Sequence, residues 1–196
     1  MKKAESDSRY GIIDSYLKAG AELRFQTLSL REQIARAASL ISESYRSGGK
    51  LLTFGNGGSA ADAQHVAAEF TGRFQMERVP LPAIALTANQ SAITAIGNDF
   101  GFDEIFARQV RALAKPGDVV MGITTSGKSS NVLNGLRAAR RAGAKTIGLC
   151  GLSGDMDELS DVLLAVPGTT TSLLQEVHIA LGHLLCLLVE EELFGR

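Results

Sequence analysis

Apolar residues recur with two periods along the chain, and these periods predict helices alternating with strands. Between Ile12 and Ser47 the spacing is helical and predicts two helices. Five short, continuous apolar runs then predict buried strands at 50–55, 82–86, 117–123, 145–151 and 161–166. Helical patterns separate the runs at 59–73, on both sides of a loop at 97–102, and at 131–144. A final helix is expected from about 171 to 194.

This alternation predicts an α/β fold. Short apolar strands joined by helices form a parallel sheet with helices on both faces, in three α/β/α layers. The chain has 196 residues and no recognisable interdomain linker. We therefore expect a single domain over 1–196, with a helical N-terminal arm at 1–48.

Composition and charge narrow the functional classes. Twenty basic and 21 acidic residues leave a net charge of −1, without a basic block, so nucleic-acid binding is not expected. No signal peptide is visible, and the longest apolar run, at 179–189, is too short to span a bilayer. We expect a cytoplasmic protein that does not bind a membrane. Cys150 and Cys186 lie in apolar runs and are expected to be buried thiols.

Two turns rich in glycine and serine follow the first and third expected strands. Ligands of such sheets bind beyond the carboxyl ends of the strands, where both turns lie. The second turn carries four hydroxyl side chains around its glycine: Thr124, Thr125, Ser126 and Ser129. Hydroxyls and free N–H groups at a helix start suit the phosphate of a phosphate ester. The alternative is that Ser59 and Ser129 only cap helices.

His65 and Glu69 lie four residues apart on the helix expected after the first turn. Both therefore project from one helical face, about 6 Å apart along the axis. Imidazole and carboxylate at this spacing suit two ligands of zinc or a similar divalent ion. Taken alone, such a pair is more often a solvated surface pair.

The last expected helix adds three candidates. Gln175 and His183 share a face but are separated by roughly 12 Å of helix rise, so they could bind one ion only by leaning toward each other. Without a ligand role, His183 would be a core histidine with a backbone partner. His178 points about 60° away from this face. We interpret His178 as a partly exposed histidine that binds no metal.

Four segments together resemble the sedoheptulose-7-phosphate isomerases (phosphoheptose isomerases) of the sugar isomerase (SIS) fold. They are GNGGSAADAQHVAAEF, TAIGNDFGFDEIFARQV, TTSGKSSNV and LLQEVHIALGH, and the likeness runs from about residue 30 to the end. The resemblance implies a five-stranded parallel sheet, a homotetramer with sites at subunit boundaries, and one zinc ion per subunit. It also implies interconversion of sedoheptulose 7-phosphate and D-glycero-D-manno-heptose 7-phosphate through an enediol. This reaction begins bacterial heptose synthesis for lipopolysaccharide or other glycoconjugates.

By position, the resemblance implies roles for individual residues. The implied metal ligands are His65, Glu69, Gln175 and His183. Glu69 would act as the base and His183 as its partner acid. Substrate contacts are implied for Asn56, Gly57, Gly58, Ser59, Glu69, Asn98, Asp99, Thr124, Thr125, Ser126, Ser129 and Gln175.

The segment before Gln175 departs from the family pattern. Many members carry an Asp and then a basic residue where this chain has Thr170 and Leu173, a difference that bears on the sugar more than on the reaction type. The alternative function is a non-catalytic tetramer of the same fold that binds the replication initiator or senses a sugar phosphate. Initiator-binding relatives lack the His/Glu pair and the last-helix histidine. The presence of His65, Glu69 and His183 in this chain therefore favours the enzyme.

Overall fold

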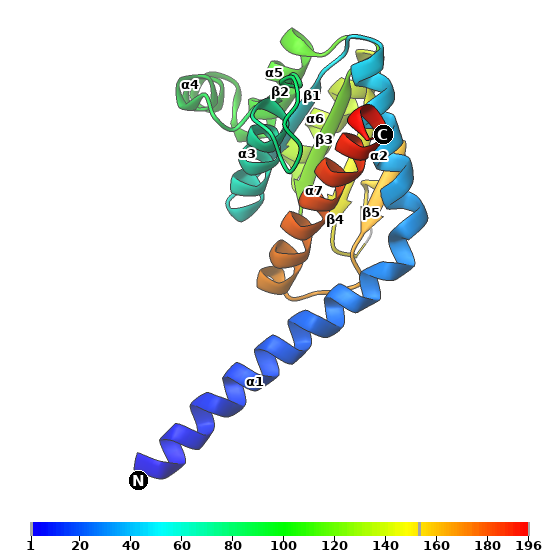
Figure 1. The fold of residues 1–196 in the computed structure, drawn as a ribbon. Coiled ribbons are helices and arrows are strands. Elements are labelled where there is room, and N and C mark those ends of the chain that lie inside the picture. Colours follow the sequence, from blue (N-terminus) through cyan, green and yellow to red (C-terminus); the bar gives the residue numbers. More distant parts are fainter. Residues whose placement is uncertain (1, 153, 196) are drawn as a thin grey trace.

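The computed structural model describes residues 2–152 and 154–195 and has three α/β/α layers (Figure 1). The described residues form five strands, all parallel, in the order β2-β1-β3-β4-β5. They are β1 (Leu51–Gly55), β2 (Ala83–Ala85), β3 (Val119–Thr124), β4 (Lys145–Cys150) and β5 (Val162–Ala165). The predicted fold class is therefore confirmed.

Helices cover both faces of the sheet. They are α1 (Lys2–Gln26), α2 (Arg31–Arg46), α3 (Gly58–Thr71), α4 (Gln90–Phe100), α5 (Ile105–Leu113), α6 (Ser130–Arg141) and α7 (Thr171–Phe194). Short 3₁₀ turns are η1 (Thr27–Leu30), η2 (Phe102–Glu104) and η3 (Asp157–Leu159). One face packs on α2, α3 and α7, and the other on α5 and α6. Neighbouring strand residues serve opposite faces: Leu51 belongs to the first core and Leu52 to the second, which explains the continuous apolar runs.

Two predicted boundaries were wrong. The first helix begins at Lys2 rather than near Ile12, because the preceding residues include good helix formers that continue it. The loop predicted at 97–102 is largely helical, since α4 continues to Phe100. Gly101 ends α4 with a φ of 89°, a conformation that glycine adopts without steric cost.

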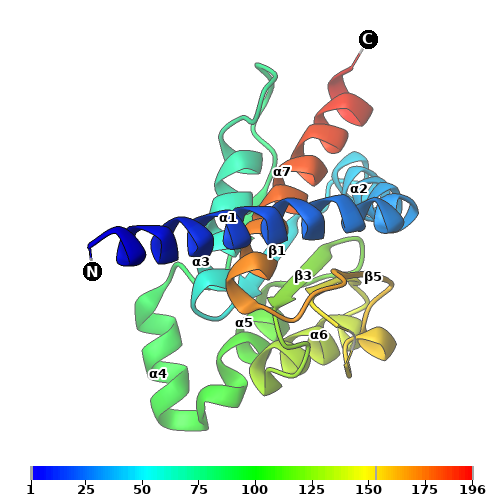
Figure 2. The same cartoon turned by 90° about the horizontal axis from the view of Figure 1, so that it is seen from below.

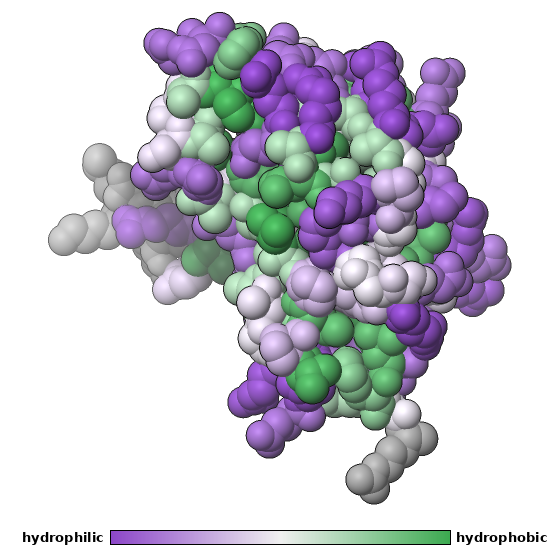
Figure 3. All heavy atoms as spheres, turned by 90° about the horizontal axis from the view of Figure 1, so that it is seen from above, coloured by the Kyte–Doolittle hydropathy of each residue, from purple (hydrophilic) through white to green (hydrophobic). Residues whose placement is uncertain are grey.

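The arm α1 stands out from the domain (Figure 1) and crosses the start of α7 (Figure 2). The Tyr16 hydroxyl donates a hydrogen bond to Glu176 Oε1 at 2.7 Å, which ties the arm to α7. Large apolar side chains of this arm are exposed: Tyr10, Ile12, Ile13, Tyr16, Leu17 and Phe25. On the face seen from above, hydrophilic and apolar residues are intermixed (Figure 3). The arm thus carries apolar surface that the single chain does not cover.

Helix α7 is longer than the apolar run at 179–189. Its 24 residues make it long and apolar enough to cross a membrane, so the length argument does not apply to the whole helix. Half of its most apolar window is buried, and it packs against α2 and α3. Leu181 and Leu185 belong to the core beneath it. Its composition is therefore explained by its place as the central core helix of this face.

Candidate functional site

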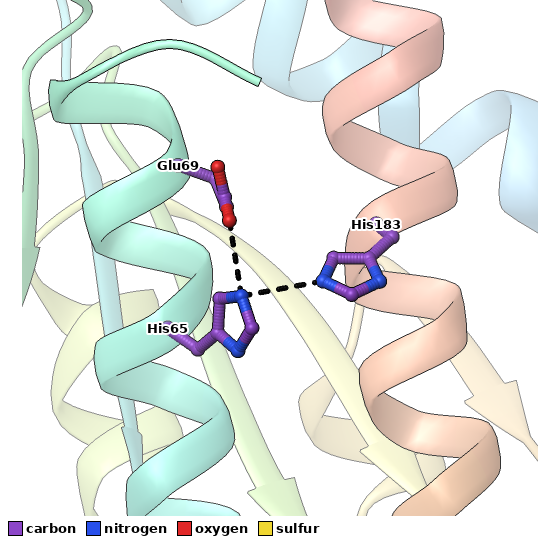
Figure 4. Close-up of side chains that lie close together, drawn as sticks. All are labelled: His65, Glu69 and His183. Carbon is purple, nitrogen blue, oxygen red and sulfur yellow. Dashed lines mark hydrogen bonds and ion pairs between the residues drawn. The ribbon is translucent and has the colours of Figure 1, made fainter. Parts of the chain in front are cut away.

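Three side chains predicted as metal ligands meet between α3 and α7 (Figure 4). His65 Nε2 lies 3.0 Å from Glu69 Oε1 and 3.3 Å from His183 Nε2. One potential ligand atom from each residue lies within 4.8 Å of the other two. Two imidazole nitrogens and a carboxylate oxygen are a ligand set typical of catalytic zinc. This donor set fits a divalent metal, and His183 is not the core histidine with a backbone partner of the alternative interpretation.

Close approach of the two helices brings the cluster together. Gly182 on α7 faces Val66 on α3, and a Cβ added to Gly182 would lie 2.6 Å from Val66 Cγ2. Glycine therefore lets α7 approach α3 at the positions next to His183 and His65. The His65 side chain is 47% exposed and that of Glu69 24%, so the cluster is open to a ligand from solvent.

Gln175 lies beside the first glycine turn. Its amide packs against Gly58, where a Cβ would come 2.5 Å from Gln175 Nε2. Gly58 and His65 are seven residues apart on α3, which corresponds to about 10 Å along the axis. Gln175 thus lies beside a turn for which substrate contacts are also predicted, and both its substrate-contact role and its metal-ligand role stay predictions.

An amide pair joins the two turns. The side chains of Asn56 and Asn131 exchange two hydrogen bonds of 2.9 Å each. Asn131 is buried in the first turn of α6, so the pair fixes the turn after β1 against the turn after β3. Asn131 was not predicted as a site residue, although its place directly after the hydroxyl-rich turn was a usable signal.

The hydroxyls of the second turn bond to one another. Thr124 Oγ1 lies 2.9 Å from Ser129 Oγ and 3.2 Å from Ser126 Oγ. Thr125 is half-buried, and its carbonyl accepts a hydrogen bond from the N–H of Gly151. The turn therefore gathers hydroxyl groups at the start of α6, where backbone N–H groups favour an anion.

The helix-capping alternative is wrong for both serines. Ser129 is the N-cap residue of α6, but its side chain makes no capping hydrogen bond. The N-cap of α3 is Gly57, so Ser59 lies inside the helix, where it is buried. Gly57 has a φ of 56°, which glycine adopts most readily. Among the described residues, neither helix start thus has a side-chain cap that would compete with a ligand.

Asn98 and Asp99 lie on a separate helix. Both are exposed near the end of α4, and Asn98 Nδ2 donates to Asp99 Oδ1 at 2.8 Å. No residue of α4 is buried, and the helix packs mainly on η2 and α5 (Figure 1). Among the described residues, α4 makes no extensive contact with α3 or α7, which carry the cluster.

Asp62 is a candidate that was not predicted. It lies one turn before His65, and its Oδ2 is buried without a hydrogen-bond partner among the described residues. Burial raises the pKa of the Asp62 carboxyl to about 6, an effect that His65 partly opposes. A carboxyl with such a pKa beside the cluster is suited to proton transfer.

His178 is buried, so its prediction as partly exposed was wrong. It is 1% exposed, because the side of α7 that carries it also packs against the rest of the domain. Burial lowers the pKa of His178 to about 4, which the backbone of Cys150 partly opposes. Cys150 and Cys186 are buried free thiols, as predicted, and burial raises their pKa values to about 11 and 12.

The two positions that depart from the family pattern face the arm. Thr170 and Leu173 line a groove of about 610 Å³ between α1 and α7. Ile12, Tyr16 and small residues of α1 form the other wall. Both positions therefore lie on a groove that the domain shares with the arm.

Comparisons with known proteins agree with this arrangement. Residues 15–151 match the SIS domain family. The phosphoheptose isomerase of Solidesulfovibrio magneticus is 54% identical over 96% of this chain and 93% of its own length. That of Aquifex aeolicus is 50% identical over 94% and 97%.

Solved structures give the same result. The phosphoheptose isomerase from Neisseria gonorrhoeae matches with a TM-score of 0.88 and 41% identity, over 93% of this chain and 98% of that chain. The one from Francisella tularensis matches with a TM-score of 0.90 and 38% identity, over the same shares. The chain therefore belongs to the phosphoheptose isomerases, aldose–ketose isomerases with a SIS domain, as its four motifs predicted.

Proposed function

We propose that this chain interconverts sedoheptulose 7-phosphate and D-glycero-D-manno-heptose 7-phosphate, at the start of bacterial heptose synthesis. The meeting of His65, Glu69 and His183 carries the proposal. A cluster that can exchange protons lies between α7 and the helix α3, which begins at the first turn, and a hydroxyl-rich turn follows the neighbouring strand β3. An isomerase of a sugar phosphate needs both sites: a cluster that exchanges protons at the carbonyl end of the sugar, and a turn that binds its phosphate.

The turn after β3 is the proposed phosphate site. Thr124, Ser126 and Ser129 supply hydroxyl donors, and the start of α6 supplies backbone N–H groups. The Asn56–Asn131 pair keeps this turn and the first turn in fixed relation, so Gly57 and Gly58 can contact the sugar between them. This arrangement would orient the carbonyl end of the substrate toward α3.

The cluster is the proposed metal site. His65, Glu69 and His183 would hold one zinc ion per subunit, with Gln175 as a further predicted ligand. When bound, zinc polarises a carbonyl and stabilises negative charge on oxygen.

Proton transfer is assigned to the side chains of the chain itself. Aldose–ketose conversion moves a proton between C1 and C2 of the sugar through an enediol. Glu69 Oε1 contacts His65, and no hydrogen bond involves Glu69 Oε2 among the described residues, so this oxygen can act as the base. His183, on the opposite helix, is the proposed acid at the sugar oxygens. Asp62, one turn below His65, can exchange protons with the site.

We further propose a cytoplasmic homotetramer with sites at subunit boundaries. The exposed apolar residues of α1 and the unburied helix α4 offer surfaces that a second copy could cover. Asn98 and Asp99 would then contact a substrate held at such a boundary. Their exposure in the single chain supports this arrangement.

Isomerisation of sedoheptulose 7-phosphate by the purified protein tests the proposal. Turnover should fall after chelation, return with zinc, and be lost in His183→Ala. A folded, zinc-loaded protein without turnover would instead favour another sugar phosphate or the non-catalytic alternative. Turnover that survives chelation would contradict the metal role, and a tetramer is checked by sedimentation.

A further inference from the structure

A second polar cluster lies directly beside the first. Arg78 Nε donates to Glu190 Oε1 at 3.0 Å, and the two side chains are 1% and 0% exposed. Arg78 lies in the loop after α3, and Glu190 lies on α7, seven residues after His183. Buried ion pairs are often replaceable by apolar residues without loss of stability. Stability alone therefore does not explain why this position holds a buried ion pair.

The Glu190 carboxylate fixes the loop after α3. Its two oxygens accept hydrogen bonds from the backbone N–H groups of Phe74, Gln75 and Met76, each at 2.9 Å. Burial alone would raise the pKa of Glu190, but these three N–H groups and Arg78 hold it below its ordinary value. A charged carboxylate on α7 thus holds three successive residues of the loop.

The Arg78 guanidinium fixes the end of α3. Nη1 donates to the carbonyl of Phe70 at 2.8 Å, and Nη2 donates to the carbonyl of Glu69 at 2.9 Å. Nη1 also lies within hydrogen-bond distance of the Gly72 carbonyl. The backbone that carries the proposed base is therefore bound directly to Arg78.

Phe74 connects this network to the histidines. Its ring stacks on the His183 imidazole, with centroids 5.4 Å apart and planes at 24°. His183 in turn meets His65 edge-on, with centroids 4.9 Å apart and planes at 72°. The N–H of Phe74 is one of the groups that Glu190 binds. Glu190 is thus linked through the Phe74 backbone to the ring that stacks on His183.

We propose that Arg78 and Glu190 are positioning residues for the cluster, acting through two routes. Glu190 holds Phe74 against His183, and Arg78 holds the backbone of Glu69. Both are needed because catalytic and metal-binding groups must be held within a fraction of an ångström. The inference rests on the proposed metal and catalytic roles of His65, Glu69 and His183.

The Phe74 route is tested by Phe74→Leu and Phe74→Tyr. In the metal-free protein, loss of the stacked ring should shift the His183 Cε1–H resonance in Phe74→Leu, whereas Phe74→Tyr should keep it. Zinc affinity should fall roughly tenfold in the Leu variant only. Phe106→Leu is the matched control, because Phe106 stacks on Phe54 at 4.8 Å on the opposite face of the sheet. An unshifted resonance and unchanged affinity in Phe74→Leu would overturn this route.

The ion pair is tested by Arg78→Lys, which keeps the charge but not the forked hydrogen bonds. We expect zinc affinity and kcat to fall about 10–100-fold, with a smaller change in KM. Asp118→Asn is the control, because Asp118 is also buried and accepts bonds from Lys50 Nζ and from the N–H groups of Lys50 and Lys115. The control should lose thermal stability without losing zinc affinity.

The outcomes separate the two proposals. If folded Arg78→Lys keeps the zinc affinity and the His183 resonance of the wild type, the ion pair has a purely structural role. If Glu190→Gln does not fold, Arg78→Lys and Phe74→Leu still decide the question. If the wild-type protein binds no zinc and has no turnover, the proposed function fails, while the resonance of metal-free His183 still tests the positioning.

Discussion

Two glutamates of the facing helices α3 and α7 have opposite surroundings. Glu190 is fully buried, and its oxygens accept hydrogen bonds from three backbone N–H groups and from Arg78. Glu69 is 24% exposed and contacts only His65 through its side chain among the described residues. A carboxylate with every lone pair engaged cannot take a proton or a ligand, whereas Glu69 can do both. The number of unused lone pairs distinguishes the group for chemistry from the group for structure.

The largest expected effect is on catalysis by Glu69→Gln. The amide cannot act as a base, so kcat should fall 10²–10⁴-fold, equivalent to about 3–5 kcal/mol. The isomerisation assay measures this loss, and zinc binding is measured on the same sample. Near-normal turnover with retained zinc would remove Glu69 as the base.

Glu190→Gln should lower the free energy of unfolding by about as much as Glu69→Gln raises the catalytic barrier. The variant leaves Arg78 buried without its countercharge, which costs about 3–5 kcal/mol of unfolding free energy. Denaturant titration at one protein concentration measures it, with Glu69→Gln as the control. If Glu190→Gln loses no more unfolding free energy than Glu69→Gln, the two glutamates do not differ in their structural role.

His178, a buried histidine on α7, makes the free energy of unfolding depend on pH. The pKa of His178 is about 4 in the folded protein, below the ordinary value of 6.5. Between these values the unfolded chain binds a proton that the folded protein does not, so stability is complete above pH 6.5 and falls toward pH 4. The shift corresponds to about 3 kcal/mol. The difference in unfolding free energy between the wild type and His178→Gln should be smaller at pH 5 than at pH 7. An equal difference at the two pH values would contradict the shift.

The smallest expected effect is at the phosphate turn. Ser129→Ala removes one hydroxyl donor to a charged group, worth about 1.5 kcal/mol, so KM should rise roughly tenfold at similar kcat. Steady-state kinetics measure it, with Ser39→Ala as a control because the Ser39 hydroxyl bonds Glu192 instead. An unchanged KM would place the phosphate elsewhere.

Local spacing made much of this structure predictable. Continuous apolar runs identified all five strands, because parallel strands are buried on both faces. The His65–Glu69 contact followed from four-residue spacing, which an α-helix places on one face. These features depend only on residues close together in the chain.

Long-range packing could not be predicted in the same way. The contact of His65 with His183 joins residues 118 apart and depends on how closely Gly182 lets α7 approach α3. The burial of His178 depends on the same packing. The Arg78–Glu190 pair spans 112 residues, and no local pattern connects its members. His183 was a candidate on the last expected helix, and the motif resemblance implied its role, whereas nothing comparable pointed to Arg78.

Helix α7 also restricts where the chain can change length. Gln175, His183 and Glu190 lie on one uninterrupted helix, so their mutual positions follow from its rise and turn alone. One residue inserted between His183 and Glu190 would rotate the following part by about 100° and advance it by about 1.5 Å. The carboxylate would then point away from Arg78. We expect insertions and deletions to accumulate in the connections between elements during evolution and to be excluded from this helix.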